Sequence, residues 1–140
     1  MSDRYFLDTN IFIYAHVEPP ARKGSIARSL VREALASREG IVSYQVVQEF
    51  FSVAFGKAKP AMRVLDAQHY LDTVFRPLLA VPFSVGLVNE AMELRERYRL
   101  SWYDSLIVAS ALESRCGTLF TEDLQHGQKF RSLVATNPFL

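Results

Sequence analysis

The stretch Arg4-Tyr5-Phe6-Leu7-Asp8-Thr9-Asn10 contains the pattern that decides the fold. Its short apolar run indicates a buried strand, and the Asp-Thr-Asn that follows is typical of a turn that begins a helix. A second strand end of this kind occurs at Leu119-Phe120-Thr121, which leads into Glu122-Asp123. Because ligands of open parallel sheets bind outside the carboxyl ends of the strands, these two segments predict a polar site at one sheet edge.

Strand-like and helix-like segments alternate along the rest of the chain. Apolar residues at helical spacing predict helices over residues 11–15, 25–39, 44–55, 67–78, 87–98 and 102–114. Further short strands are predicted at 41–42, 79–81 and 133–135, with Ser43 as a helix cap. This alternation favours an α/β fold, a central parallel sheet flanked by helices on both faces. We expect one domain over residues 1–140.

Composition excludes several classes of protein. The 140 residues are 49% hydrophobic, which suits one globular domain with a core that needs no metal or disulfide. The one cysteine, Cys116, excludes a disulfide framework and a Cys-based zinc site, and the three histidines are too scattered to form one. The longest uncharged stretch, Pro77 to Asn89, is too short to span a bilayer. We expect a cytoplasmic protein without membrane association.

Four acidic residues lie at positions that cannot all be explained as ordinary solvated surface. Asp8 and Asp123 follow strands, whereas Glu49 and Asp104 lie in unusually apolar helices, Asp104 on the face expected to pack. Each has an ordinary alternative: an Asx turn for Asp8, a loop acid for Asp123, a Lys or Arg partner for Glu49 and a helix cap for Asp104. Because four separate explanations would be needed at once, we predict a convergent acidic cluster.

An acidic cluster of this kind repels itself unless a cation is bound. The cation that suits carboxylate and water ligands is Mg²⁺ or Mn²⁺, and Mg²⁺ commonly binds one or two carboxylates together with substrate phosphates. The sequence therefore predicts hydrolysis of phosphodiester bonds by a metal-activated water.

The segments Phe6-Leu7-Asp8-Thr9-Asn10, Gln48-Glu49, Tyr103-Asp104-Ser105-Leu106-Ile107 and Thr121-Glu122-Asp123 resemble the ordered acidic motifs of the PIN-domain nucleases. The resemblance is closer to the VapC-like toxins of type II toxin–antitoxin systems. It implies that Asp8, Glu49, Asp104 and Asp123 are the catalytic and metal-binding residues, and that Thr9, Asn10 and Thr121 order the site. Many relatives have Asn where this chain has Gln48, and Glu122 is an additional acid that could replace or support Asp123.

The same resemblance implies an endoribonuclease dependent on Mg²⁺, with Mn²⁺ as a substitute. Its substrate would be structured RNA such as tRNA or rRNA, and its partners a small cognate antitoxin and a second copy in a homodimer. Two other functions stay open: a PIN nuclease of RNA processing or DNA repair without an antitoxin, and a non-catalytic PIN module that binds RNA or protein.

Basic residues near the predicted sheet edge are candidates for contacts with RNA, although solvated surface is the ordinary interpretation of each alone. The expected contacts are Lys57, Lys59, His126 and Lys129, and further candidates are Arg22, Lys23 and Arg131. Trp102 and Tyr103 could stack on bases, but we expect core or dimer contacts for both. Without the four predicted site acids, 16 basic groups face 11 acidic ones, so a net charge of +1 is compatible with RNA binding.

Overall fold

The structure is a computed structural model, and it describes residues 3–16 and 21–140. Within this part of the chain, six strands form one sheet in the order β3-β2-β1-β4-β6-β5. The strands are β1 (Tyr5–Leu7), β2 (Gly40–Ser43), β3 (Leu79–Val81), β4 (Thr118–Phe120), β5 (Lys129–Phe130) and β6 (Leu133–Thr136). Neighbouring strands are parallel except β5, which runs antiparallel to β6 at one edge. The predicted α/β fold with a parallel sheet is confirmed.

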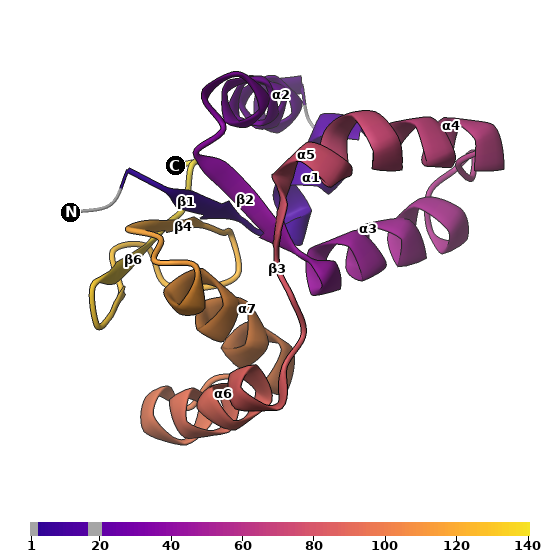
Figure 1. The fold of residues 1–140 in the computed structure, drawn as a ribbon. Helices are drawn as coiled ribbons and strands as arrows, with labels where there is room; N and C mark the ends of the chain where they lie inside the picture. The colour runs from indigo at the N-terminus through magenta and orange to yellow at the C-terminus, as the bar shows by residue number, and fades with distance from the viewer. Residues whose placement is uncertain (1–2, 17–20) are drawn as a thin grey trace.

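Helices cover both faces of this sheet (Figure 1). The helical elements are α1 (Thr9–His16), α2 (Ala21–Ser37), α3 (Tyr44–Gly56), α4 (Val64–Tyr70), the π-helical turn η1 (Leu71–Phe75), α5 (Arg76–Leu78), α6 (Val85–Tyr98) and α7 (Trp102–Glu113). Helices α6 and α7 pack together below the sheet in Figure 1, whereas α1, α2 and α5 lie above it. The pair formed by α3 and α4 extends away from the sheet. None of the described helices combines the length and the apolar run that crossing a membrane requires.

Strand β1 lies inside the sheet and brings together the two predicted strand ends. Phe6 and Leu7 are fully buried, and Leu7 pairs with Phe120 of β4. The backbone continues this pairing beyond the strand, because Asp8 N donates to Phe120 O at 3.0 Å. Asp8 and the residues after Phe120 are therefore held at the same edge of the sheet.

Helix α2 crosses the start of β2 so closely that only glycine fits there. A Cβ atom at Gly40 would lie 2.4 Å from the Ala34 Cβ and 2.8 Å from Tyr5 Cε2. Any side chain at this position would push α2 away from the sheet, which explains why a glycine follows the helix.

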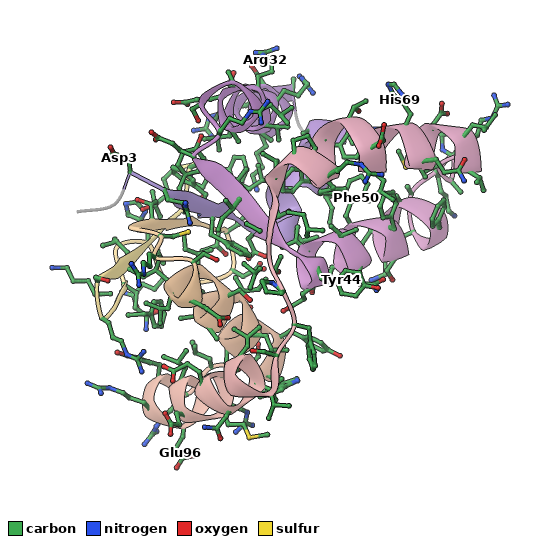
Figure 2. All side chains as sticks on the ribbon, in the orientation of Figure 1. Asp3, Arg32, Tyr44, Phe50, His69 and Glu96 are labelled. Carbon is green, nitrogen blue, oxygen red and sulfur yellow. The ribbon has the colours of Figure 1, made fainter. Side chains whose placement is uncertain are left out.

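Aromatic packing holds α3 in place. Phe50, labelled in Figure 2, projects into the space between α3 and the helices above it. Its ring stacks on Tyr70 at 5.1 Å and meets Phe75 edge to face at 5.2 Å. Aromatic pairs at such distances add about 0.5–1.5 kcal/mol each beyond their buried area. Because Glu49 directly precedes Phe50, this packing also fixes the backbone of a predicted site residue.

The structure differs from the sequence prediction in three local features. The helix predicted after Pro60 is interrupted by the π-helical turn η1, and strand β5 was not predicted. Ser43 occupies the N-cap position of α3 with an extended backbone, but its hydroxyl makes no capping hydrogen bond. The short β5 lacks the alternating apolar pattern on which strand prediction depends.

Candidate active site

Four acidic side chains from four separate elements line one cavity of about 170 Å³. Asp8 follows β1, Glu49 lies on α3, Asp104 lies in the first turn of α7, and Asp123 follows β4. The rest of the lining is formed by Thr9, Asn10, Ile13, Gln45, Val53, Tyr103 and Ile107. The convergence of the four acids expected from the sequence is therefore present, at the carboxyl ends of the central strands.

Asp8 is the buried member of the four, with 5% of its surface exposed. Its Oδ1 accepts a hydrogen bond from Thr9 N at 2.7 Å, and its Oδ2 accepts one from Thr121 Oγ1 at 2.8 Å. Burial raises the pKa of Asp8 to about 7; the two hydrogen bonds oppose this shift, and the charges of Asp123 and Glu49 add to it. A cation placed in the cavity would remove this cost of ionisation.

Asp123 is exposed to solvent but restrained from two sides. Its backbone N donates to Thr121 Oγ1 at 3.1 Å, and its Oδ1 accepts a hydrogen bond from Asn10 Nδ2 at 3.1 Å. Partial desolvation raises the pKa of Asp123, and so do the charges of Asp104 and Glu122. Asn10 was expected to order the site around Asp8, but its side chain contacts Asp123 instead. Thr121 contacts the backbone of Asp123 and the carboxylate of Asp8.

Glu49 is positioned by hydroxyl and amide groups. Its Oε1 accepts hydrogen bonds from Thr9 Oγ1 at 2.9 Å and from Gln45 Nε2 at 3.4 Å. Gln45 Nε2 also donates to Tyr103 O at 3.2 Å, which connects α3 to α7. Gln48 is exposed, and the amide that bonds Glu49 is that of Gln45. The supporting amide therefore lies one helical turn before Glu49, a position that i,i+4 spacing could have identified.

Asp104 is half-buried at the cavity wall. Ser101 caps α7, because its Oγ accepts a hydrogen bond from Asp104 N at 3.2 Å. The Asp104 carboxylate is therefore not needed as the cap. Trp102 packs against the core, as one of its two expected roles required, whereas the Tyr103 side chain is 63% exposed beside the cavity. Tyr103 is therefore not a core residue, and its expected alternative, a contact in a dimer, stays a prediction.

The four acids have no basic partner within the described residues. The salt bridges found there join Lys23 to Glu122, Arg76 to Asp72 and Arg131 to Glu90. The alternative interpretation of Glu49 as an ion-pair partner is therefore wrong.

The acids at this cavity suit a cation that binds one or two carboxylates and completes its coordination with water. Across residues 3–16 and 21–140, no three His, Cys, Asp or Glu side chains are arranged so that they could hold a metal ion as they stand. Mg²⁺ keeps several waters and needs only one or two carboxylates, so the hard oxygen donors at this cavity fit it.

Glu122 does not line the cavity, although it directly precedes Asp123. Its carboxylate accepts hydrogen bonds from Lys23 Nζ and from Tyr14 OH, both at 2.5 Å. The hydrogen bond and the ion pair lower the pKa of Glu122 against the opposing effect of burial. Glu122 is therefore an ion-pair partner rather than a replacement for Asp123.

None of the basic candidates lines the cavity. Lys57 and Lys59 are exposed after α3, and Lys129 lies on β5 rather than in the loop expected from the sequence. The His126 Nδ1 accepts a hydrogen bond from Asn137 N at 3.0 Å. Three further candidates are already engaged: Lys23 with Glu122, Arg131 with Glu90, and Arg22 with the backbone oxygen of Phe139.

The family model described as the PIN domain matches residues 5–129. The chain therefore belongs to the PIN domain family, whose sequence match extends over the four cavity acids. No curated protein sequence matches the chain significantly.

Several solved structures share this fold. A toxin–antitoxin complex from Klebsiella pneumoniae has a TM-score of 0.66 at 19% identity, with 96% of this chain and 97% of that chain covered. FitAcB from Neisseria gonorrhoeae has a TM-score of 0.63 at 22% identity, with 96% and 98% covered. VapC20 from Mycobacterium tuberculosis, described as a sarcin-ricin loop cleaving toxin, has a TM-score of 0.60 at 21% identity, with 85% and 91% covered.

Proposed function

We propose that this protein is a metal-dependent endoribonuclease and the toxin of a type II toxin–antitoxin pair. The observation that carries the proposal is the convergence of Asp8, Glu49, Asp104 and Asp123 on one cavity without a basic partner among the described residues. Asp8, Glu49, Asp104 and Asp123 would hold Mg²⁺, one or two of them directly and the others through its waters, and Mn²⁺ can substitute. When bound, the cation would lower the pKa of a coordinated water and offset negative charge on the scissile phosphate.

The protein's own residues contribute orientation. Thr9 holds Asp8 through its backbone N–H and Glu49 through its hydroxyl, so one residue sets the relative positions of two acids. Thr121 links two acids through its hydroxyl alone, which donates to Asp8 Oδ2 and accepts from the backbone N–H of Asp123. Supporting hydrogen bonds of this kind keep ligand oxygens aimed before a cation arrives.

Structured RNA, tRNA or rRNA, is the proposed substrate. Its phosphates would approach an acidic cavity, so exposed basic groups must bind the flanking backbone. Lys57, Lys59, His126 and Lys129 are exposed and available for this role. The description of the structurally similar VapC20 as a sarcin-ricin loop cleaving toxin supports an RNA substrate.

A small antitoxin is the proposed regulatory partner. Its support is structural similarity, over 96% of this chain, to a toxin–antitoxin complex from Klebsiella pneumoniae. Co-expression with the product of a short adjacent reading frame should reverse the growth arrest that expression of this chain alone causes. Absence of growth arrest from an expressed, folded and catalytically active chain would favour a PIN nuclease outside toxin–antitoxin systems.

A second copy of the chain is the other proposed partner. The edge strand β3, the loop after it and the start of α6 expose Leu79, Phe83 and Val85, with Phe83 76% and Val85 82% exposed. These residues belong to the uncharged stretch Pro77–Asn89, so two copies can pack this face together without repulsion between charges. Phe83 also lines an apolar cavity of about 250 Å³, which a partner side chain can fill.

The decisive experiment is RNA cleavage by purified protein with Mn²⁺ or Mg²⁺, followed by mapping of the new RNA ends. We expect cleavage at defined sites, loss of cleavage with EDTA, and loss of cleavage in Asp8→Asn. Full activity of a folded Asp8→Asn variant would exclude the proposed site. Absence of cleavage together with retained RNA binding would instead favour a non-catalytic PIN module.

A further inference from the structure

A compact cluster beside the acidic cavity has no place in the proposed chemistry so far. The Glu122 carboxylate has both oxygens occupied: Oε2 accepts from Lys23 Nζ and Oε1 accepts from Tyr14 OH, each at 2.5 Å. Lys23 comes from α2 and Tyr14 from α1, whereas Glu122 follows β4. We call these three residues the Glu122 clamp, because they fasten the segment after β4 to two helices.

Aromatic rings enclose the clamp. The Lys23 ammonium lies 5.0 Å from the centroid of the Tyr14 ring and 5.7 Å from that of Phe139, within the range of cation–π attraction. The Tyr14 and Phe139 rings pack edge to face at 5.1 Å, and Arg22 Nη1 binds the backbone oxygen of Phe139. The C-terminal segment therefore packs against the clamp.

The clamp differs from an ordinary surface ion pair. The Lys23 and Glu122 side chains are 32% and 22% exposed, compared with 73% and 64% for Arg76 and Asp72. Exposed pairs contribute little because water screens them and both side chains lose freedom. A partly enclosed pair with a second donor on the same carboxylate has a defined geometry, so it can position the backbone that bears it.

Glu122 is the residue immediately before Asp123, whose side chain lines the cavity. Asp123 is exposed, and the negative charges of Asp104 and Glu122 act on it. One hydrogen bond, from Asn10 Nδ2, holds the Asp123 carboxylate against rotation into solvent. We propose that Lys23 and Tyr14 are positioning residues that hold Asp123 at the cavity by anchoring Glu122. The inference rests on the proposed function, in which Asp123 is a metal ligand.

The first test is calorimetric titration of the full chain with Mn²⁺ alone. Lys23→Met removes the ammonium and keeps much of the side-chain volume, and we expect about tenfold weaker Mn²⁺ binding, the scale found when support of a metal ligand is lost. Lys23→Arg keeps a cationic donor and should restore affinity to nearly the wild-type value. Arg28→Met, which removes a positive charge from an exposed position on the same helix, should bind Mn²⁺ as wild type does.

The second test needs no metal. The Asp123 amide donates to Thr121 Oγ1, so its hydrogen exchange, followed by NMR, reports whether the segment stays in place. We expect faster exchange at Asp123 in Lys23→Met, with the amides of β1 unchanged. Tyr14→Phe, which removes only a hydroxyl, should show a smaller change in the same direction and decides the matter if Lys23→Met does not fold.

Unchanged exchange at Asp123 in both variants would overturn the inference, as would unchanged Mn²⁺ affinity in a wild type that binds Mn²⁺. If wild type binds no Mn²⁺, the proposed metal site fails and the exchange experiment alone judges the clamp.

Discussion

The hydroxyl of Thr121, at the end of β4, donates a 2.8 Å hydrogen bond to Oδ2 of Asp8, at the end of β1. Both residues are buried, Thr121 completely. The parallel pairing of β1 with β4 places them side by side, and the same hydroxyl accepts the backbone N–H of Asp123. A single buried hydroxyl thus joins two of the four cavity acids.

Replacing Thr121 with Val should impair the site more than the fold. The change keeps the shape of the side chain but leaves Asp8 Oδ2 and Asp123 N without this partner. We expect a loss of about 1–3 kcal/mol in the free energy of unfolding, the cost of leaving a buried polar group unsatisfied. Cleavage activity should fall by about tenfold or more, because the support of a ligand is lost. Urea unfolding and initial cleavage rates measure the two effects.

Thr121→Ser is the matched control for this substitution. It keeps the hydroxyl, so most of the activity should return even if the lost methyl group reduces stability. Equal activity losses in the Val and Ser variants would show that packing, rather than the hydrogen bond to Asp8, matters at this position.

Asp8 should make the metal-free protein less stable as the pH rises. Its native pKa of about 7 lies above the ordinary value of 3.8, so the folded protein holds this proton more tightly than the unfolded chain does. The stabilising contribution is complete below pH 3.8 and is lost as the pH rises to about 7. In Asp8→Asn this pH dependence should disappear. The melting temperature of the variant, relative to that of wild type, should therefore rise between pH 4.5 and pH 8.

Thermal melts of both proteins in EDTA at several pH values measure this difference. Adding Mn²⁺ at pH 8 should raise the melting temperature of wild type and leave Asp8→Asn nearly unchanged, because a ligand that binds only the folded state stabilises it. A constant difference in melting temperature across the pH range would contradict the raised pKa of Asp8.

Gln45 and Gln48 offer a matched pair of substitutions on one helix. Gln45 Nε2 donates to Glu49 Oε1 and to Tyr103 O, whereas Gln48 is exposed. Gln45→Ala should therefore reduce RNA cleavage about tenfold by releasing Glu49. Gln48→Ala should cleave at the wild-type rate. Initial cleavage rates at saturating and at limiting Mn²⁺ compare the two variants. A larger loss of rate in Gln48→Ala than in Gln45→Ala would show that Gln45 is not the amide that supports Glu49.

Strand ends and helix periodicity were sufficient to predict most of the fold and the convergence of the four acids. Asp8 and Asp123 follow strands that pair in parallel, so their proximity follows from topology. Glu49 and Asp104 were predicted as site residues because burying an unpaired carboxylate in an apolar helix is costly. Their roles in catalysis and metal binding stay predictions, which the experiments above test.

Apart from the contact of Gln45 with Glu49 one helical turn away, the contacts around the acids could not be predicted, because they depend on side chains from distant segments. Tyr103 is a large aromatic residue, a type common in cores, but it lies in the first turn of α7 beside the cavity and is 63% exposed. Glu122 and Asp123 are adjacent acids, and only the position of Lys23, 99 residues earlier, shows which of them faces the cavity. Strand β5 consists of two residues, too few for any periodicity.

The apolar face at β3 and α6 should hold two copies of the chain together. Phe83→Glu places a charge at a side chain that is 76% exposed and lines the apolar cavity, so dimers would have to bury two carboxylates there. Wild type should sediment as a dimer and Phe83→Glu as a monomer. Leu65→Glu makes the same kind of change at a 74% exposed residue of α4, on another element, and should remain dimeric. A monomeric wild type, or a dimer that Phe83→Glu leaves intact, would exclude this face as the contact between copies.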